Sequence, residues 1–138
     1  MRSLVKNENL QDQIKIDSAG TAAYHIGKLA DPRMRATANK HGIELVSRAR
    51  QFKAADFDTF DIILAMDSSN YSNILTLAVA EEDIQKVKLM RSYDIPEYKN
   101  EDVPDPYYGG DSGFENVYQL LERSCKNLLK KIKNEYNL

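Results

Sequence analysis

The hydrophobic residues of this chain follow the pattern of β-strands in three short places. Ile14 and Ile16 alternate with Lys15, and residues 87–90 form a similar short segment. Residues 62–66 are a continuous apolar run preceded and followed by aspartates, which is typical of a strand buried on both faces of a parallel sheet. The pattern therefore predicts strands at 14–16, at 62–66 and at 87–90.

Apolar residues spaced by three and four predict helices over about residues 1–9, 31–41 and 70–78, and a long helix from about residue 113. Asp31 and Pro32 suit the N-cap and the first helical position, and Gly42 suits a left-handed C-terminal cap. The apolar stripe of the long helix consists of Phe114, Val117, Leu121, Cys125, Leu128 and Ile132. Because Cys125 lies on this stripe, its thiol is expected to be buried, protonated and unreactive.

This order of strands and helices predicts one α/β domain over residues 1–138, with a small parallel sheet and helices on both faces. Ligands of such sheets bind beyond the carboxyl ends of the strands. The polar segments that follow the three predicted strands contain Ser18, Asp67 and Asp105. We therefore expect these three residues to approach one crevice.

The segment from Val103 to Gly110 has the composition of a rigid loop. Pro104 and Pro106 restrict the backbone on both sides of Asp105, and two tyrosines and two glycines follow. Such a loop holds a carboxyl group in a defined position beside two aromatic rings. A surface turn of the same composition is the alternative interpretation.

Composition excludes several classes of partner. The net charge of −2 gives no electrostatic reason to expect nucleic acid or anionic membrane as a partner. No apolar run approaches the roughly 20 residues of a membrane span, and no signal-peptide core is present, so a cytoplasmic location is expected. One cysteine allows no internal disulfide and no cysteine-based metal cluster. The basic segment 47–51 favours a solvated loop, with phosphate attraction as the second interpretation.

Several short motifs occur in one order with fitting gaps. They are Ser18-Ala19-Gly20-Thr21, Asp31-Pro32-Arg33, Ala49-Arg50-Gln51, Met66-Asp67 and Asp105-Pro106-Tyr107-Tyr108-Gly109-Gly110. Together they resemble the low-molecular-weight protein tyrosine phosphatases over essentially the whole chain. The resemblance implies a four-stranded parallel sheet and hydrolysis of phosphotyrosine proteins or aryl phosphates through a phosphocysteine intermediate, without a metal or other cofactor.

The resemblance also implies roles for particular residues. Asp105 matches the general acid that protonates the departing phenolate, and a bound phosphate dianion would keep its carboxyl protonated. Tyr24, Tyr107 and Tyr108 match substrate-binding positions beside an aromatic slot. Ser18 and Asp67 match residues that brace the phosphate-binding loop.

One feature of that family is missing from these residues. Its nucleophile loop, a Cys followed five residues later by Arg and Ser, has no counterpart here, and Lys131 rather than Arg stands six residues after Cys125. We therefore predict a member truncated at its N-terminus, without the first strand, and inactive alone. Because that strand lies inside the family's sheet, its absence predicts poor folding or a dimer formed through unpaired strand edges.

Two other functions fit the residues less well. A non-catalytic, phosphatase-like binding module would use the remaining crevice, although the phosphate-binding loop is the part that is missing. An arsenate reductase on the same fold would need several cysteines to relay electrons, so we set it aside.

Overall fold

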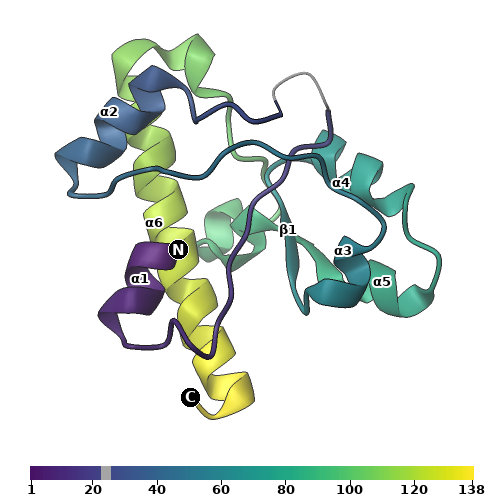
Figure 1. The fold of residues 1–138 in the computed structure, drawn as a ribbon. Coiled ribbons are helices and arrows are strands. Elements are labelled where there is room, and N and C mark those ends of the chain that lie inside the picture. The colour runs from purple at the N-terminus through teal and green to yellow at the C-terminus, as the bar shows by residue number, and fades with distance from the viewer. Residues whose placement is uncertain (23–25) are drawn as a thin grey trace.

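The computed structural model describes residues 1–22 and 26–138, and the side chains of residues 108–111 lie outside that description. The elements in chain order are α1 (Arg2–Asn7), α2 (Pro32–Lys40), α3 (Asp56–Thr59), β1 (Ile63–Ala65), α4 (Ser68–Leu75), α5 (Glu81–Lys86), β2 (Val87–Leu89) and α6 (Gly110–Tyr136). Three short 3-10 helices, η1 (Met90–Tyr93), η2 (Pro96–Tyr98) and η3 (Pro106–Gly109), lie between β2 and α6. Figure 1 shows β1 between α6 on one side and α4 on the other.

The sheet consists of two parallel strands within the described residues. Ile63 pairs with Val87, and Ala65 pairs with Leu89. The predictions of strands at 62–66 and 87–90 are therefore confirmed, with shorter bounds. The strand predicted at 14–16 is wrong, because no ladder forms there. Alternating isoleucines favour an extended backbone, but a strand also requires a neighbouring edge with which to pair.

The segment after residue 16 has one isolated bridge instead of a strand. Gly20 pairs in parallel with Gln51: the Gly20 N–H donates to the Arg50 carbonyl oxygen at 2.8 Å, and the Phe52 N–H donates to the Gly20 carbonyl oxygen at 2.8 Å. These bonds attach the turn at residues 18–21 to the segment that leads into α3.

The apolar residues form two separate clusters. The cluster around β1 consists of Phe57, Ile63, Ala65, Ile74 and Val87. The second cluster joins α1 to α6 through Val5, Leu10 and Leu129, with Ile14 and Ile16 packed against it. The alternating isoleucines therefore contribute to packing although they form no strand.

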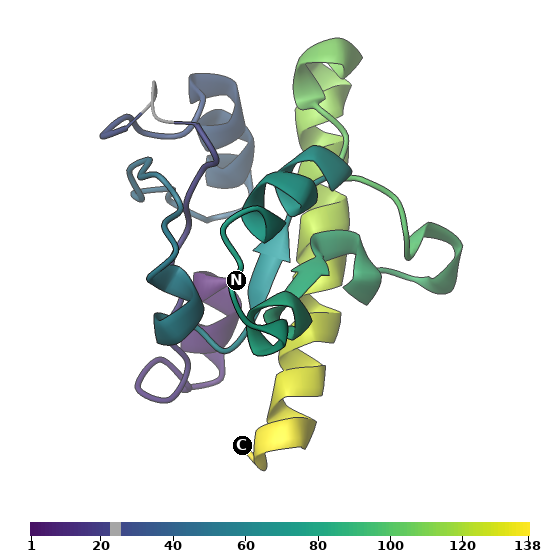
Figure 2. The same cartoon turned by 90° about the vertical axis from the view of Figure 1, so that its right-hand side faces the viewer.

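Helix α6 is the long amphipathic helix that the sequence predicted. Figure 2 shows it running the length of the molecule. Phe114, Val117 and Leu128 of the predicted stripe are buried. Cys125 is half-buried rather than buried, because the fully buried face of α6 contains its neighbour Ser124 instead. Burial still raises the pKa of the Cys125 thiol, so the thiol stays protonated at neutral pH.

Helix α2 begins and ends as predicted. The Asp31 carboxylate accepts the Arg33 N–H at 2.8 Å, Pro32 is the first helical residue, and Gly42 after the helix has φ of +76°. His41, which follows the last residue of α2, connects α2 to α6. Its Nε2 lies 2.7 Å from Glu115 Oε1, and its ring stacks on Tyr118 with centroids 3.9 Å apart.

Within residues 1–22 and 26–138, no helix is long and apolar enough to cross a membrane.

Candidate functional site

The segment 103–110, called the Asp105 loop below, is attached to the carboxyl end of β1. The Val103 N–H donates to the Met66 carbonyl oxygen at 2.8 Å. The Asp102 carboxylate accepts two bonds from Ser68, at 2.8 Å from the backbone N–H and at 2.7 Å from the hydroxyl. These bonds place the loop directly beside the start of α4.

The turn at residues 18–21 contacts the same end of α4. Asn70 Nδ2 donates to the Thr21 hydroxyl at 3.4 Å. Ser18 is exposed in this turn, and its N–H donates to the Asp17 carboxylate at 2.8 Å. The segments that follow Ile16 and Met66 are thereby brought together with the Asp105 loop.

Asp67 begins α4. Its carboxylate accepts the Asn70 N–H at 2.7 Å, which is the bond of an N-cap residue. A residue with this role fixes the direction of the helix beside the Asp105 loop. Its predicted contact with a phosphate-binding loop stays a prediction.

Asp105 is exposed, and the start of η3 orients it. Its Oδ1 accepts the Tyr107 N–H at 2.9 Å, and its second carboxylate oxygen has no hydrogen bond to another described residue. Helix α6 packs closely behind the loop, because a Cβ placed on Gly113 would lie only 2.6 Å from the Pro106 carbonyl oxygen. The carboxyl group is therefore accessible and still held in a defined position.

Tyr107 is held from α2, a connection that the sequence did not reveal. Its hydroxyl donates to the Asp31 carboxylate, and the Arg33 guanidinium carbon lies 4.4 Å from its ring centroid. The same guanidinium carbon is 4.8 Å from the ring centroid of buried Phe114. Tyr107 nevertheless remains 58% exposed, so much of its ring is accessible to a ligand. Local patterns cannot show such a contact, because 76 positions separate Asp31 from Tyr107.

The structure does not describe the side chains of the two other predicted substrate-binding residues. Tyr24 lies outside the described residues, and the side chain of Tyr108 does so too. Their predicted contacts with substrate stay predictions.

The bonds around Asp31 change its pKa. The Tyr107 hydroxyl and the Arg33 side chain stabilise the carboxylate and lower the pKa of Asp31 to about 2. The same bond raises the pKa of Tyr107, because the ionised phenolate would face the Asp31 carboxylate. Around neutral pH, Asp31 is therefore ionised and Tyr107 carries its proton.

Replacing Tyr107 by phenylalanine is expected to raise the pKa of Asp31 from about 2 toward the ordinary value of a carboxyl group, because the largest stabilising bond is removed. Carbon-13 NMR of the Asp31 carboxyl group measures this shift. Tyr98→Phe is the matched control, since Tyr98 is absent from the interactions that shift Asp31. An unchanged Asp31 titration in Tyr107→Phe would contradict the contact.

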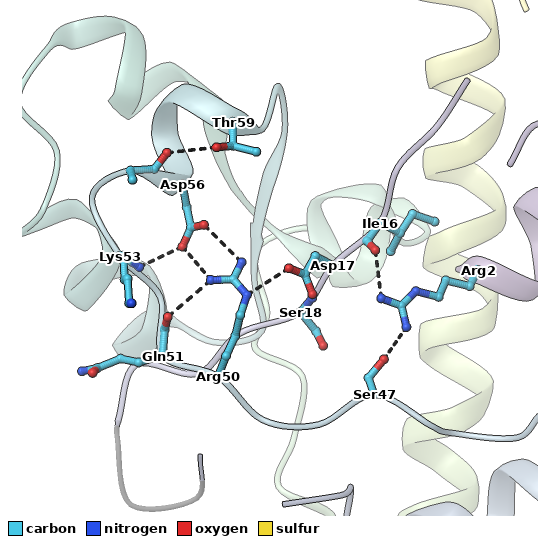
Figure 3. A network of polar contacts seen from close by, with 11 residues as sticks. Arg2, Ile16, Asp17, Ser18, Ser47, Arg50, Gln51, Lys53, Asp56 and Thr59 are labelled. Atoms are coloured by element: carbon cyan, nitrogen blue, oxygen red, sulfur yellow. Dashed lines mark hydrogen bonds and ion pairs between the residues drawn. The ribbon is translucent and has the colours of Figure 1, made fainter. Parts of the chain in front are cut away.

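In the basic segment 47–51, the Arg50 side chain forms ion pairs within the protein. It is therefore neither part of a purely solvated loop nor free to attract a phosphate, the two interpretations that the sequence offered. Figure 3 shows Arg50 bridging two carboxylates: its Nε is 2.9 Å from Asp17, and its two terminal nitrogens are 3.0 and 3.1 Å from Asp56. Arg48 donates to the Gly27 carbonyl oxygen at 2.9 Å. Arg50 thus connects α3 to the residue before Ser18 and steadies the turn at the candidate site.

The described residues contain no group of three or more His, Cys, Asp or Glu side chains that could hold a metal ion. Cys125 is also far from the Asp105 loop. It lies 15 residues after Gly110 in α6, which corresponds to about 22 Å along a helix. One phosphate group cannot contact both the Cys125 thiol and the Asp105 carboxyl at that separation.

The fold corresponds to that of protein tyrosine phosphatases. The crystal structure of a protein tyrosine phosphatase from Entamoeba histolytica with Hepes in its active site superposes with a TM-score of 0.89 at 38% identity. The superposition covers 98% of this chain and 85% of that one.

The model of the family described as low molecular weight phosphotyrosine protein phosphatase matches residues 1–138, and the chain belongs to this family. The Rattus norvegicus low molecular weight phosphotyrosine protein phosphatase is 44% identical over 131 residues, which are 94% of this chain and 82% of that protein. A Streptomyces coelicolor low molecular weight protein-tyrosine-phosphatase is 38% identical over 135 residues, 97% of this chain and 82% of the relative.

Proposed function

We propose that Asp105 is the general acid in the hydrolysis of phosphotyrosine monoesters through a phosphocysteine intermediate. The observation that carries this proposal is the exposed Asp105 carboxyl, which accepts the backbone N–H of Tyr107 at the start of η3, while the ring of Tyr107 is itself accessible. A phenolate leaves readily only when it is protonated, so an acid held close to the ester oxygen accelerates the first step. The same group then removes a proton from the water that hydrolyses the phosphocysteine.

Tyr107 provides one wall for the aromatic ring of the substrate. The Arg33 guanidinium and Phe114 hold its ring, and its exposed part is free to stack on a phenyl group. Tyr24 and Tyr108 complete the slot in this proposal. Ser18 and Asp67 brace the phosphate-binding loop from the two segments that meet beside α4.

We also propose that these 138 residues do not hydrolyse phosphotyrosine alone. Their single cysteine is half-buried, the pKa of its thiol is raised, and it lies about 22 Å along α6 from the Asp105 loop. Lys131 stands where an Arg would follow a nucleophilic cysteine, so bidentate binding of phosphate is also missing there.

The 138-residue chain is expected to give no turnover of p-nitrophenyl phosphate above that of its Cys125→Ser variant, because neither contains a reactive thiolate. Steady-state release of p-nitrophenolate measures this, and rapid acid quenching tests for a trapped phospho-enzyme. Turnover that disappears in Cys125→Ser would identify Cys125 as the nucleophile and overturn the proposal. A phospho-enzyme formed by the unaltered chain would overturn it as well.

A further inference from the structure

A hollow lies between the start of α3 and the segment that connects α4 to α5. Its volume is about 550 Å³. Phe57 contributes to its lining and belongs to the core cluster around β1, so the wall that it forms is firmly packed. Leu77 and Val79 line the hollow from the connecting segment. We call this site the α3–α5 hollow.

The apolar residues of the α3–α5 hollow are unusually accessible. Val79 is 95% exposed, and Leu77 is 40% exposed. The backbone that carries Val79 is nevertheless fixed, since the Asp83 carboxylate accepts the N–H groups of Val79 and Ala80 at 3.1 Å each. Binding of a partner therefore costs little ordering entropy at this segment and is favoured by the apolar surface that it removes from water.

The charged residues that line the hollow are all acidic. Asp58, Glu82 and Asp83 line it together with the apolar residues, and none of the described residues that line it is Lys or Arg. The backbone bonds from Ala80 and Val79 lower the pKa of Asp83, so its negative charge persists at neutral pH. The nearby Lys86 amino group donates to the Phe57 carbonyl oxygen.

We propose that the α3–α5 hollow is a docking site for a polypeptide segment in which a large aliphatic side chain is flanked by Lys or Arg. The aliphatic group would cover Val79 and Leu77, and the flanking cations would face Asp58 and Glu82. The carboxylates favour a cationic segment over an anionic or neutral one. The apolar wall in addition favours a segment that carries an aliphatic side chain over one that is only charged.

The α3–α5 hollow is separate from the candidate functional site, which contains Asp67 and the Asp105 loop. Asp67 and the Asp105 loop lie at the N-terminal end of α4, whereas Leu77 and Val79 follow its C-terminal end. The eight residues of α4 span about 12 Å. A docked segment thus leaves the Asp105 loop accessible, and the inference stands independently of the proposed reaction.

The probe for this site is the synthetic peptide acetyl-Arg-Lys-Leu-Leu-Lys-Arg-amide, titrated into the 138-residue chain and followed by amide NMR. We expect shift changes concentrated in residues 54–58 and 77–83. Val79→Ser and Glu82→Lys should each weaken binding at least fivefold, because they remove the apolar contact and one attractive charge. Val46→Ser and Glu44→Lys are the matched controls: Val46 is 61% exposed and Glu44 is also exposed, and neither residue lines the hollow.

A second peptide separates docking from general attraction between charges. Replacing both leucines of the probe by serine keeps its charge and should weaken binding at least fivefold. Equal binding of the two peptides would overturn the proposal. The same conclusion would follow if Glu44→Lys weakened binding as much as Glu82→Lys, or if the probe shifted no resonance of residues 54–58 and 77–83.

Discussion

Replacing Asp105 by asparagine is expected to lower kcat for phenyl phosphate by about 10²–10⁴-fold in a chain that has a nucleophile. If Cys125 is not the nucleophile, as proposed above, the suitable background is this chain joined to a segment that carries a Cys-x5-Arg-Ser loop. Asparagine keeps the bond to the Tyr107 N–H but has no proton to give to the departing phenolate. Steady-state kinetics with phenyl phosphate measures the change.

The leaving group provides the internal control for Asp105. p-Nitrophenolate needs less help from an acid than phenolate does, so the loss in Asp105→Asn should be clearly smaller with p-nitrophenyl phosphate. Asp61→Asn, at the other end of β1, should leave both rates unchanged. Equal losses on the two substrates would show that Asp105 acts on something other than proton transfer to the leaving group.

Replacing Asp94 by alanine is expected to lower the free energy of unfolding by about 3–5 kcal/mol, the usual effect of breaking a buried ion pair. The Asp94 side chain has no exposed surface. Its oxygens accept bonds from Arg91 Nε at 3.0 Å, from Arg123 Nη2 at 3.0 Å and from the Ile95 N–H at 2.8 Å. Without this carboxylate, the buried guanidinium of Arg91 loses its closest anionic partner.

Urea denaturation of Asp94→Ala measures that change, and Glu101→Ala is its control. Glu101 also pairs with Arg91, at 3.4 Å, but its side chain is 58% exposed, so its removal should change stability by about 1 kcal/mol or less. Equal effects of the two substitutions would contradict the importance of burial.

The contribution of Asp94 to the free energy of unfolding is expected to decrease as the pH falls. Burial alone would raise the pKa of Asp94, but the bonds from Arg123, the Ile95 N–H and Arg91 outweigh it and hold the pKa below its ordinary value. The carboxylate therefore contributes stability that is fully present above the pKa of the unfolded chain and is lost as the pH falls through the lower folded pKa. In Asp94→Ala, this acid-dependent part of the stability should be missing.

Local sequence patterns predicted the parts of the fold that depend on a few neighbouring residues. The cap and first turn of α2 depend on Asp31 and Pro32, and β1 depends on one uninterrupted apolar run. The same patterns failed at residues 14–16, where alternation predicted a strand. Those isoleucines pack against the cluster of α1 and α6, and none of the residues that the structure describes pairs with them as a strand.

The sequence by itself determined the class of domain, the family, and the order of helices α1, α2, α4 and α6, whereas it did not predict α3 or α5. The helices follow from residue types and spacings within single segments, and the family follows from the order of several short motifs along the chain. Only the tertiary structure decided that Arg50 joins Asp17 to Asp56, and that Asp31 and Arg33 hold Tyr107. These pairings depend on which distant segments pack together. The residues next to a charged side chain in the sequence do not identify the partner with which it will pair.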